Sequence, residues 1–419
     1  MGIDMRMAWR NIWRNPRRTL LTVAAIAFAC ILLVFMLSFQ LGSYDTMINA
    51  SVKIHTGHLQ IQAEGYDESH DMRDVIPDPA TVGRILDGIP AVKAYTYRAT
   101  AFALAASQNR ACGVVVEGID PVREAGVSTL ADIIRQGRYL GADDSPVGDA
   151  PAGALVGQLL ARNLDLAVGD EVTILGQGRD GSVAATVLRV QGLYASGIEA
   201  FDRRSIQIPL PVFQQVFSMQ GAVHKVVVLA RSLADVPQIA SALAPRLKTL
   251  STPRPLVVLD WKALTPGLDQ AIKMDLVSGS IFYLILIMVV AFSILNTFLM
   301  AIFERTHEFG VMMAMGTRPG RLSRLVLMES IGMTLVGVVS GIVLGLAITA
   351  YFMVHGIDMG ASANEIMRQF GIPSRFYPQL SLISATAGPA AVFLITLMAA
   401  LYPALKIRRL TPVAAMRHT

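Results

Sequence analysis

The stretch TLLTVAAIAFACILLVFMLSFQLGSY, residues 19–44, contains no Asp, Glu, Lys or Arg and exceeds the roughly 20 residues that a helix needs to cross a bilayer core. Three later runs share this property and cover residues 276–303, 330–357 and 376–405. One such run would also fit a buried core helix, but four of this length predict four transmembrane helices. The first run is too long for the apolar part of a signal peptide and no small-residue cleavage site follows it, so we expect a retained span.

The composition agrees with a membrane protein. The chain has 419 residues, of which 16% are charged, well below the roughly 25% typical of soluble globular proteins. The formal net charge of +5 would suit a nucleic-acid partner, but the excess of Lys and Arg lies at the ends of the apolar runs. This distribution is the positive-inside pattern, and we therefore expect no nucleic-acid partner.

Basic clusters predict the orientation. They lie before the first run, between the second and third runs, and after the fourth run. By the positive-inside rule both termini, the 304–329 loop and the 406–419 tail are cytoplasmic. Segments 45–275 and 358–375 then face the other side, so we expect a multi-pass protein of the bacterial inner (cytoplasmic) membrane with a large periplasmic domain.

Residues 1–18 form an amphipathic segment with Trp9 and Trp13 four positions apart and arginines at the same spacing. On a helix this spacing gives an aromatic stripe beside an arginine stripe, which suits the headgroup region of a membrane. Pro16 is expected to end this helix or to kink it into the span. The alternative is a plain basic flank that only fixes topology. The predicted membrane-interface residues are Trp9, Arg10, Trp13, Arg14, Arg17 and Arg18.

Segment 45–275 is predicted to be a mixed α/β domain with its own core. Two lobes are expected, one from about 45–105 and 220–275 near the membrane and a distal one from about 106–219. Alternating patterns predict strands at 58–62, 113–118, 171–175, 184–191, 204–209 and 225–229. Helical patterns occur at 79–86, 130–136, 156–164, 211–217 and 233–247, and residues 142–153 are predicted to be a surface loop.

The stretch ERTHEFGVMMAMGTRPGRLSRLVLME, residues 304–329, follows the second span directly. We expect the second span to continue as a helix until Gly316, a glycine C-cap, and a new helix to begin at Pro319. A helix–turn–helix with a Met-rich surface suits docking into a groove of a soluble partner. The alternative is an ordinary basic cytoplasmic loop.

This stretch resembles the coupling segment of the FtsX-like permease family of ABC transporters, which includes the MacB, LolC and LolE permeases. The family pattern ER-x-x-E-[FI]-G-x-x-x-A-x-G is matched through Gly316, although Met312 and Met313 replace a common Ile or Leu followed by Arg. The starts and ends of the family also look like AWRNIWRNPRRT, residues 8–19, and YPALKIRRLTPVAAMR, residues 402–417. The resemblance covers essentially the whole chain and agrees with the predicted order of span, large domain and three spans.

The resemblance implies an α-helical membrane protein with four transmembrane helices and a MacB-like α/β domain inserted between the first two, a type VII ABC permease. It implies a second permease chain, identical or different, and a cytoplasmic ABC ATPase dimer whose motion is carried to the periplasmic domain by mechanotransmission. The implied ATPase-coupling residues are Glu304, Arg305, Glu308, Phe309, Gly310, Met313, Gly316, Arg318 and Pro319.

No catalytic, cofactor or metal site is predicted on this chain. It has no G-x-x-x-x-G-K-[ST] sequence, so ATP and Mg²⁺ are expected on the partner ATPase, and residues 175–182 suit a hairpin turn. His55 and His58 would point to opposite faces of a strand. Asp202, Arg203 and Arg204 are interpreted as a solvated loop that would be free to contact a substrate or partner. Gly337, Gly341 and Gly345 are predicted to allow close helix packing within or between permease chains.

Three functions remain open at this point. Release of lipoproteins from the membrane is the preferred one, and MacB-like efflux of drugs or toxins is the second. FtsX-like signalling to cell-wall hydrolases is the third, and the large domain argues against it because signalling members have smaller ones. The predicted spans contain no Asp, Glu, Lys or Arg, which agrees with mechanotransmission rather than a polar path through the membrane.

Overall fold

The computed structural model describes residues 3–141, 144, 151–360 and 375–407, and the chain divides into two compact units. The helical unit comprises residues 1–44, 271–358 and 375–419, and the α/β unit comprises residues 45–270 and 359–374. The predicted tail beyond residue 407, most of the 358–375 loop and most of the 142–153 loop lie outside the described residues.

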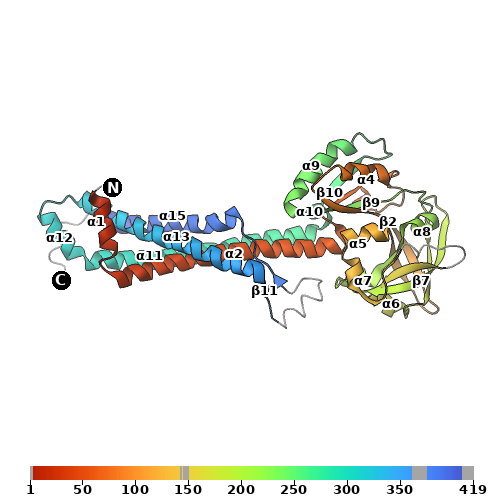
Figure 1. Ribbon diagram of the computed structural model, residues 1–419, viewed down its shortest axis with the longest axis horizontal. Coiled ribbons are helices and arrows are strands. Elements are labelled where there is room, and N and C mark those ends of the chain that lie inside the picture. Colours follow the sequence, from red (N-terminus) through yellow and green to blue (C-terminus); the bar gives the residue numbers. More distant parts are fainter. Residues whose placement is uncertain (1–2, 142–143, 145–150, 361–374, 408–419) are drawn as a thin grey trace. The chain divides into compact units, whose positions relative to one another are not determined.

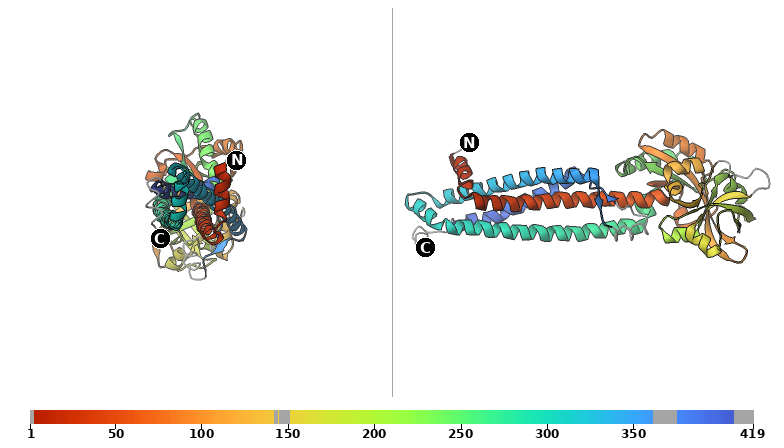
Figure 2. Two further views of the ribbon diagram at one scale, coloured as in Figure 1. Left: turned by 90° about the vertical axis from the view of Figure 1, so that its left-hand side faces the viewer. Right: turned by 60° about the horizontal axis from the view of Figure 1, so that its bottom comes forward.

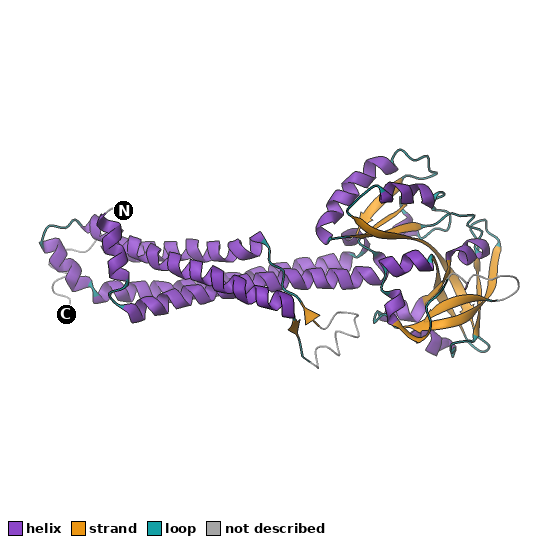
Figure 3. Ribbon diagram, viewed as in Figure 1, coloured by secondary structure: helices purple, strands orange, loops and turns teal. Residues whose placement is uncertain are grey.

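The described part of the helical unit contains six helices (Figures 1 and 3). They are α1 (Ile3–Ile12), α2 (Pro16–Ser51), α11 (Pro266–Glu304), α12 (Thr306–Ala314), α13 (Pro319–His355) and α15 (Leu382–Ile407). The helices α2, α11, α13 and α15 are each long and apolar enough to cross a membrane. Figure 2 shows α2, α11 and α13 running side by side.

The ends of these helices differ from the ends of the apolar runs. α2 continues past Tyr44 and passes into a π-helical turn at Val52–Thr56, while α11 already begins at Pro266. α13 begins at Pro319, well before the third apolar run, and ends two residues before the end of that run, where Gly356 has φ +68°. The pair β11 (Ile357–Asp358) and β12 (Arg375–Phe376) lies between α13 and α15, so α15 begins at Leu382, six residues after the start of the fourth run. An apolar run marks the part of a helix that suits lipid, and the helix itself begins and ends on backbone grounds.

The glycines of α13 lie against α2. A Cβ atom added at Gly337 would come within 2.8 Å of Ile26, and one at Gly345 within 3.2 Å of Val34. At Gly341 it would lie 2.5 Å from the Cβ atom of Cys30 and 2.8 Å from the Ala27 carbonyl oxygen. The row of small residues therefore lets the two helices approach closely, as membrane helices do where hydrophobic burial cannot drive their association.

The α/β unit is built on one sheet whose ten described strands have the order β10-β1-β9-β2-β3-β8-β5-β7-β4, with β6 pairing both β2 and β7. Neighbours are antiparallel except for the parallel pairs β3–β8 and β5–β7. One hydrophobic cluster runs from Leu59 and Leu86 to Val190 and Leu193, so the sheet and core are continuous across the two predicted lobes. The strands are β1 (Leu59–Ala63), β2 (Val92–Ala106), β3 (Ala111–Ile119), β4 (Ile134–Gly137), β5 (Ala152–Gly157), β6 (Glu171–Gln177), β7 (Val183–Tyr194), β8 (Ser205–Pro209), β9 (Lys225–Ala230) and β10 (Leu256–Asp260).

Short helices cover the sheet. One of the predicted elements there is wrong in type, because residues 130–136 form a 3₁₀ turn (Leu130–Ile133) followed by β4 instead of a helix. The strand predicted at 204–209 is confirmed as β8 and begins one residue later, because Arg204 ends α7. The predicted turn at 175–182 is confirmed, since Gly178 donates its N–H to the Ser182 carbonyl at 2.8 Å between β6 and β7. The helices are α3 (Tyr66–Ser69), α4 (Pro79–Asp87), α5 (Pro121–Val127), α6 (Gln158–Leu164), α7 (Glu199–Arg204), α8 (Leu210–Val216), the 3₁₀ turn Leu233–Asp235, α9 (Val236–Leu247) and α10 (Trp261–Leu264).

Buried polar groups fix the first strands of this sheet. Arg98 of β2 is 1% exposed and its Nε atom donates to Glu124 of α5 at 3.0 Å, while its Nη1 atom donates to the backbone carbonyl of His55. Two buried histidines accept hydrogen bonds from backbone N–H groups. The Nδ1 atom of His224 accepts from the Thr100 N–H at 2.9 Å, and that of His58 accepts from the Ala230 N–H at 3.1 Å. Burial lowers the pKa of His224 to about 4 and also lowers the pKa of His58.

The close contact between α2 and α13 predicts the effect of one added methyl group. Gly341→Ala is expected to lower the free energy of unfolding by about 1–3 kcal/mol, because the new Cβ atom overlaps Cys30 and the backbone of Ala27. Gly320→Ala is the matched control, since an added Cβ there meets no atom within 4 Å. Thermal unfolding in detergent measures both variants, and equal melting temperatures would contradict the packing.

The two buried histidines predict that the α/β unit loses stability in acid. Both pKa values are lower in the folded than in the unfolded state, so below pH 6.5 the unfolded chain binds protons that the folded one does not, and for His224 this window extends down to about pH 4. Stability should therefore fall as the pH falls, by up to about 1.4 kcal/mol per pH unit and histidine. In thermal unfolding from pH 7 to pH 4, His224→Asn should show a shallower dependence, since the amide oxygen still accepts from Thr100 but does not titrate.

Candidate functional site

The segment between α11 and α13 is the candidate functional site. Its backbone differs from the predicted continuous helix at Arg305. The second span does not continue to Gly316, because α11 ends at Glu304 and Arg305 has φ −102° and ψ 7°, outside the helix. The break is followed at once by α12, whose first residue, Thr306, donates its hydroxyl to the Ile302 carbonyl at 2.9 Å.

The end of α12 has the predicted glycine cap. Gly316 has φ +93°, a left-handed conformation that favours glycine. Its N–H donates to the Met313 carbonyl at 3.0 Å, and the Thr317 N–H donates to the Met312 carbonyl at 3.0 Å, which is a Schellman motif. Arg318 is then the N-cap residue of α13 and Pro319 is in its first turn, as the sequence predicted.

Ion pairs tie the break to the neighbouring helices. Arg305 donates to both carboxylate oxygens of Glu329 in α13, at 3.0 and 3.2 Å, and the two side chains are only 14% and 7% exposed. Glu308 of α12 accepts from Arg14 at 2.9 Å, and Glu304 accepts from Arg18 at 3.2 Å. The buried pair is the energetically important one, because exposed ion pairs are typically worth under about 1 kcal/mol.

The inner face of α12 is apolar. Phe309 is fully buried and Met313 is 7% exposed, and both pack with Ile302, Leu322 and Ile407. Gly310 is buried beside them. Three of the predicted coupling residues therefore hold α12 in place and face away from solvent. A partner would not contact these side chains directly.

The outer face of α12 and the turn after it are accessible. Met315 is 74% exposed and Val311 is 40% exposed. Arg318 and Arg324 are exposed on the turn and the first part of α13. This arrangement offers apolar contact area flanked by positive charge, which suits a groove with an acidic rim on a soluble partner.

The predicted interfacial helix is present as α1 and ends at Ile12, and Pro16 begins α2. Trp9 and Trp13 are 49% and 58% exposed with ring centroids 6.3 Å apart. Arg10 and Arg17 are exposed as well, whereas Arg14 and Arg18 form the ion pairs described above. Sequence reasoning missed those pairs, because the partners lie almost 300 positions apart, at separations of 294 and 286 residues.

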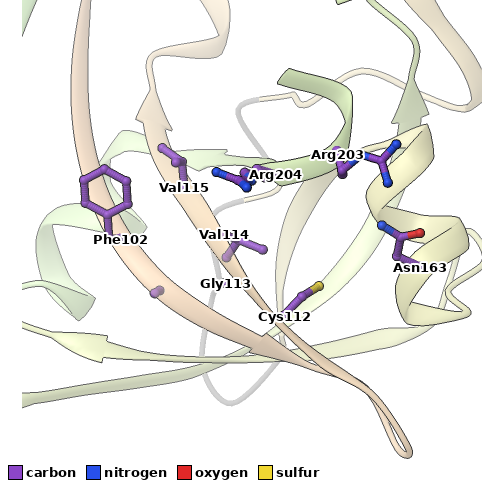
Figure 4. A pocket seen from close by; sticks show the side chains of 9 residues that line it. Phe102, Cys112, Gly113, Val114, Val115, Asn163, Arg203 and Arg204 are labelled. Carbon is purple, nitrogen blue, oxygen red and sulfur yellow. The ribbon is translucent and has the colours of Figure 1, made fainter. Parts of the chain in front are cut away.

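A second candidate region lies in the α/β unit (Figure 4). A pocket of about 480 Å³ is bounded by Phe102 and Val115 of the sheet and by Arg203 and Arg204 of α7. The interpretation of residues 202–204 as a solvated loop is wrong. Asp202 is 5% exposed and accepts hydrogen bonds from the Ser196 N–H at 2.9 and 3.1 Å. The two arginines are exposed, and their predicted contact with a substrate or partner stays a prediction.

His55 and His58 do not form a metal site with each other. His55 lies in the π-helical turn beside Glu117, 3.5 Å away, whereas His58 contacts Asn49 at 3.1 Å. Among the residues that the structure describes, no group of three or more His, Cys, Asp or Glu side chains is placed to hold a metal ion.

Comparison with known proteins gives two family matches and several relatives. The profile described as MacB-like periplasmic core domain matches residues 19–246, and that described as FtsX-like permease C-terminal matches residues 280–412. The chain is 22% identical over 398 residues to the lipoprotein-releasing system transmembrane protein LolC of Xylella fastidiosa (strain Temecula1), covering 92% of this chain and 89% of that protein. LolC of Neisseria meningitidis serogroup B is 24% identical over 340 residues, which is 78% of this chain and 77% of that protein. The macrolide export ATP-binding/permease protein MacB of Rhodospirillum rubrum is 24% identical over 435 residues, which is 99% of this chain and 60% of that protein.

The Arg305–Glu329 pair predicts where α12 is anchored. Glu329→Leu should leave a largely buried guanidinium without its main partner and weaken α12 locally by on the order of 2 kcal/mol. Faster hydrogen exchange at the amides of residues 306–316 would report this loss. Arg14→Ala is the control, because its pair with Glu308 is exposed and should contribute under about 1 kcal/mol. Equal exchange in the two variants would contradict the anchoring role.

Proposed function

We infer the function of this chain from its family: it belongs to the FtsX-like permeases with a MacB-like periplasmic core domain, which are ABC transporter permeases of the LolC and MacB type. It is a multi-pass membrane protein. We propose that it is a non-catalytic subunit that acts with a separate cytoplasmic ABC ATPase dimer and a second permease chain. ATP and Mg²⁺ would bind to the ATPase.

The outer face of α12 is the proposed contact with the ATPase. Its support is the combination of exposed Val311 and Met315 with an inner face fixed by Phe309 and the Arg305–Glu329 pair. A docking helix transmits motion only when it is bound firmly to the rest of its own chain. This arrangement is the single observation that carries the proposal.

Transmission along the first two spans is proposed to follow from their mutual contacts. Near the ends of the helical unit remote from α12, the Tyr44 hydroxyl donates to Asp275 at 2.5 Å and the Tyr283 hydroxyl donates to Gln40 at 2.8 Å. At the other end Arg18 is paired with Glu304. These contacts link α2 to α11 at both ends, which favours their movement as a pair and supports mechanotransmission to the periplasmic side.

Release of lipoproteins from the outer surface of the inner membrane is the proposed activity. Its support is the similarity to LolC proteins over most of both chains. Export in the manner of MacB is the second candidate, favoured by the match with one MacB over 99% of this chain. Co-purification with the ATPase, followed by an ATP-dependent assay for release of a lipidated protein from proteoliposomes, tests the first activity. Export of a small molecule without such release would favour the second.

A charge on the outer face of α12 tests the coupling site. Met315→Glu should lower stimulation of the partner's ATPase activity about tenfold or more, because a carboxylate would have to be buried without a partner in the apolar contact. Met274→Glu is the matched control, since Met274 is 65% exposed on α11 outside this segment. Full stimulation in Met315→Glu, with normal membrane insertion, would rule out this face as the contact.

A further inference from the structure

We propose that the pocket between the first turn of α2 and the last turns of α11 binds the phosphodiester headgroup of a membrane phospholipid. The pocket has a volume of about 660 Å³ and belongs entirely to the helical unit. Asn15, Arg17, Arg18 and Leu21 contribute one wall, and Asn296 and Met300 contribute to the other. The inference goes beyond the proposed ATPase coupling and does not depend on it.

The charge of the pocket suits one phosphate. Arg18 is already paired with Glu304 at 3.2 Å, and both side chains line the pocket. Arg17 is exposed and has no carboxylate partner among the described residues. One guanidinium is therefore left to hold an anion, and a guanidinium matches two phosphate oxygens in a planar, bidentate arrangement.

Asn296 supplies a second, independent indication. It lies in α11 within a span, its side chain is exposed, and it has no hydrogen-bond partner among the residues that the structure describes. An amide without a partner is unfavourable in hydrocarbon, which offers no donor or acceptor, so Asn296 requires a polar partner from outside the described residues. Asn296 and Arg17 line the same pocket, so one occupant of that pocket can reach both side chains.

The surroundings of the pocket are those of a membrane interface. Leu21 and Met300 line the pocket and are 71% and 56% exposed, so they offer apolar contacts for the start of the acyl chains. Trp13, 58% exposed, lies three residues before Pro16 and suits the headgroup level. Together these features favour an occupant with a phosphate, polar ester groups and apolar chains over a free anion.

The test measures bound lipid directly on the full-length protein. Protein delipidated in detergent is incubated with phosphatidylglycerol or with diacylglycerol of the same chains, and retained lipid is counted by native mass spectrometry. We expect phosphatidylglycerol to be retained and diacylglycerol not. Arg17→Ala and, separately, Asn296→Leu should lower retention about tenfold, the size expected when one strong polar contact is lost.

Arg10→Ala is the matched control, because Arg10 is an exposed arginine on α1 outside the pocket and its loss removes the same charge. Unchanged retention in Arg17→Ala, or a loss of the same size in Arg10→Ala, would overturn the proposal. Equal retention of diacylglycerol would do so too. Efficient disulfide cross-linking between two chains carrying Asn296→Cys in a bilayer would assign this face to a contact between copies instead.

Discussion

The ion pair between Arg305 and Glu329 is the interaction on which the cytoplasmic end of the helical unit depends. A guanidinium with so little access to water is stable only beside a carboxylate, so the chain can leave the helix at Arg305 only where α13 presents Glu329. Glu308 forms an ion pair with Arg14, and Phe309 packs in the apolar cluster on the inner face of α12. As a result α12, α13 and the segment between α1 and α2 are held together, and Val311 on the opposite side of α12 stays exposed.

Two kinds of contact therefore join the helices of the helical unit. Along the spans, glycines such as Gly341 have no side chain, so the backbones of α13 and α2 can approach closely, and the association of these helices depends on close packing. At the ends of the spans, where water and headgroups begin, charged side chains such as Arg18 and Glu304 join the helices. The same pair also forms part of the proposed lipid pocket, so a bound headgroup would lie against a contact that links α2 to α11.

The membrane spans and the turn at Gly316 could be predicted from sequence because the signals are local: an apolar run, a glycine, and a proline at 319. The extent of α2 could not be predicted, since Asp45 ends the apolar run without ending the helix, which continues to Ser51. The break at Arg305 could not be predicted either, because no glycine or proline stands there and the stabilising partner, Glu329, lies 24 positions away. The strand β2 was missed for a related reason. Its many alanines favour helix, and its pairing with β3 and β9 overrides that preference.

The unbroken course of the first span has a mechanical consequence. From Pro16 to Thr56 the helix runs for 41 residues, about 60 Å, and its last turns are bonded to folded structure through Lys53, whose carbonyl accepts from Thr129, and through the carbonyl of His55 that Arg98 holds. The end of this helix therefore cannot turn about its own axis without breaking the hydrogen bonds that hold it to Arg98 of β2 and to Thr129 within the α/β unit.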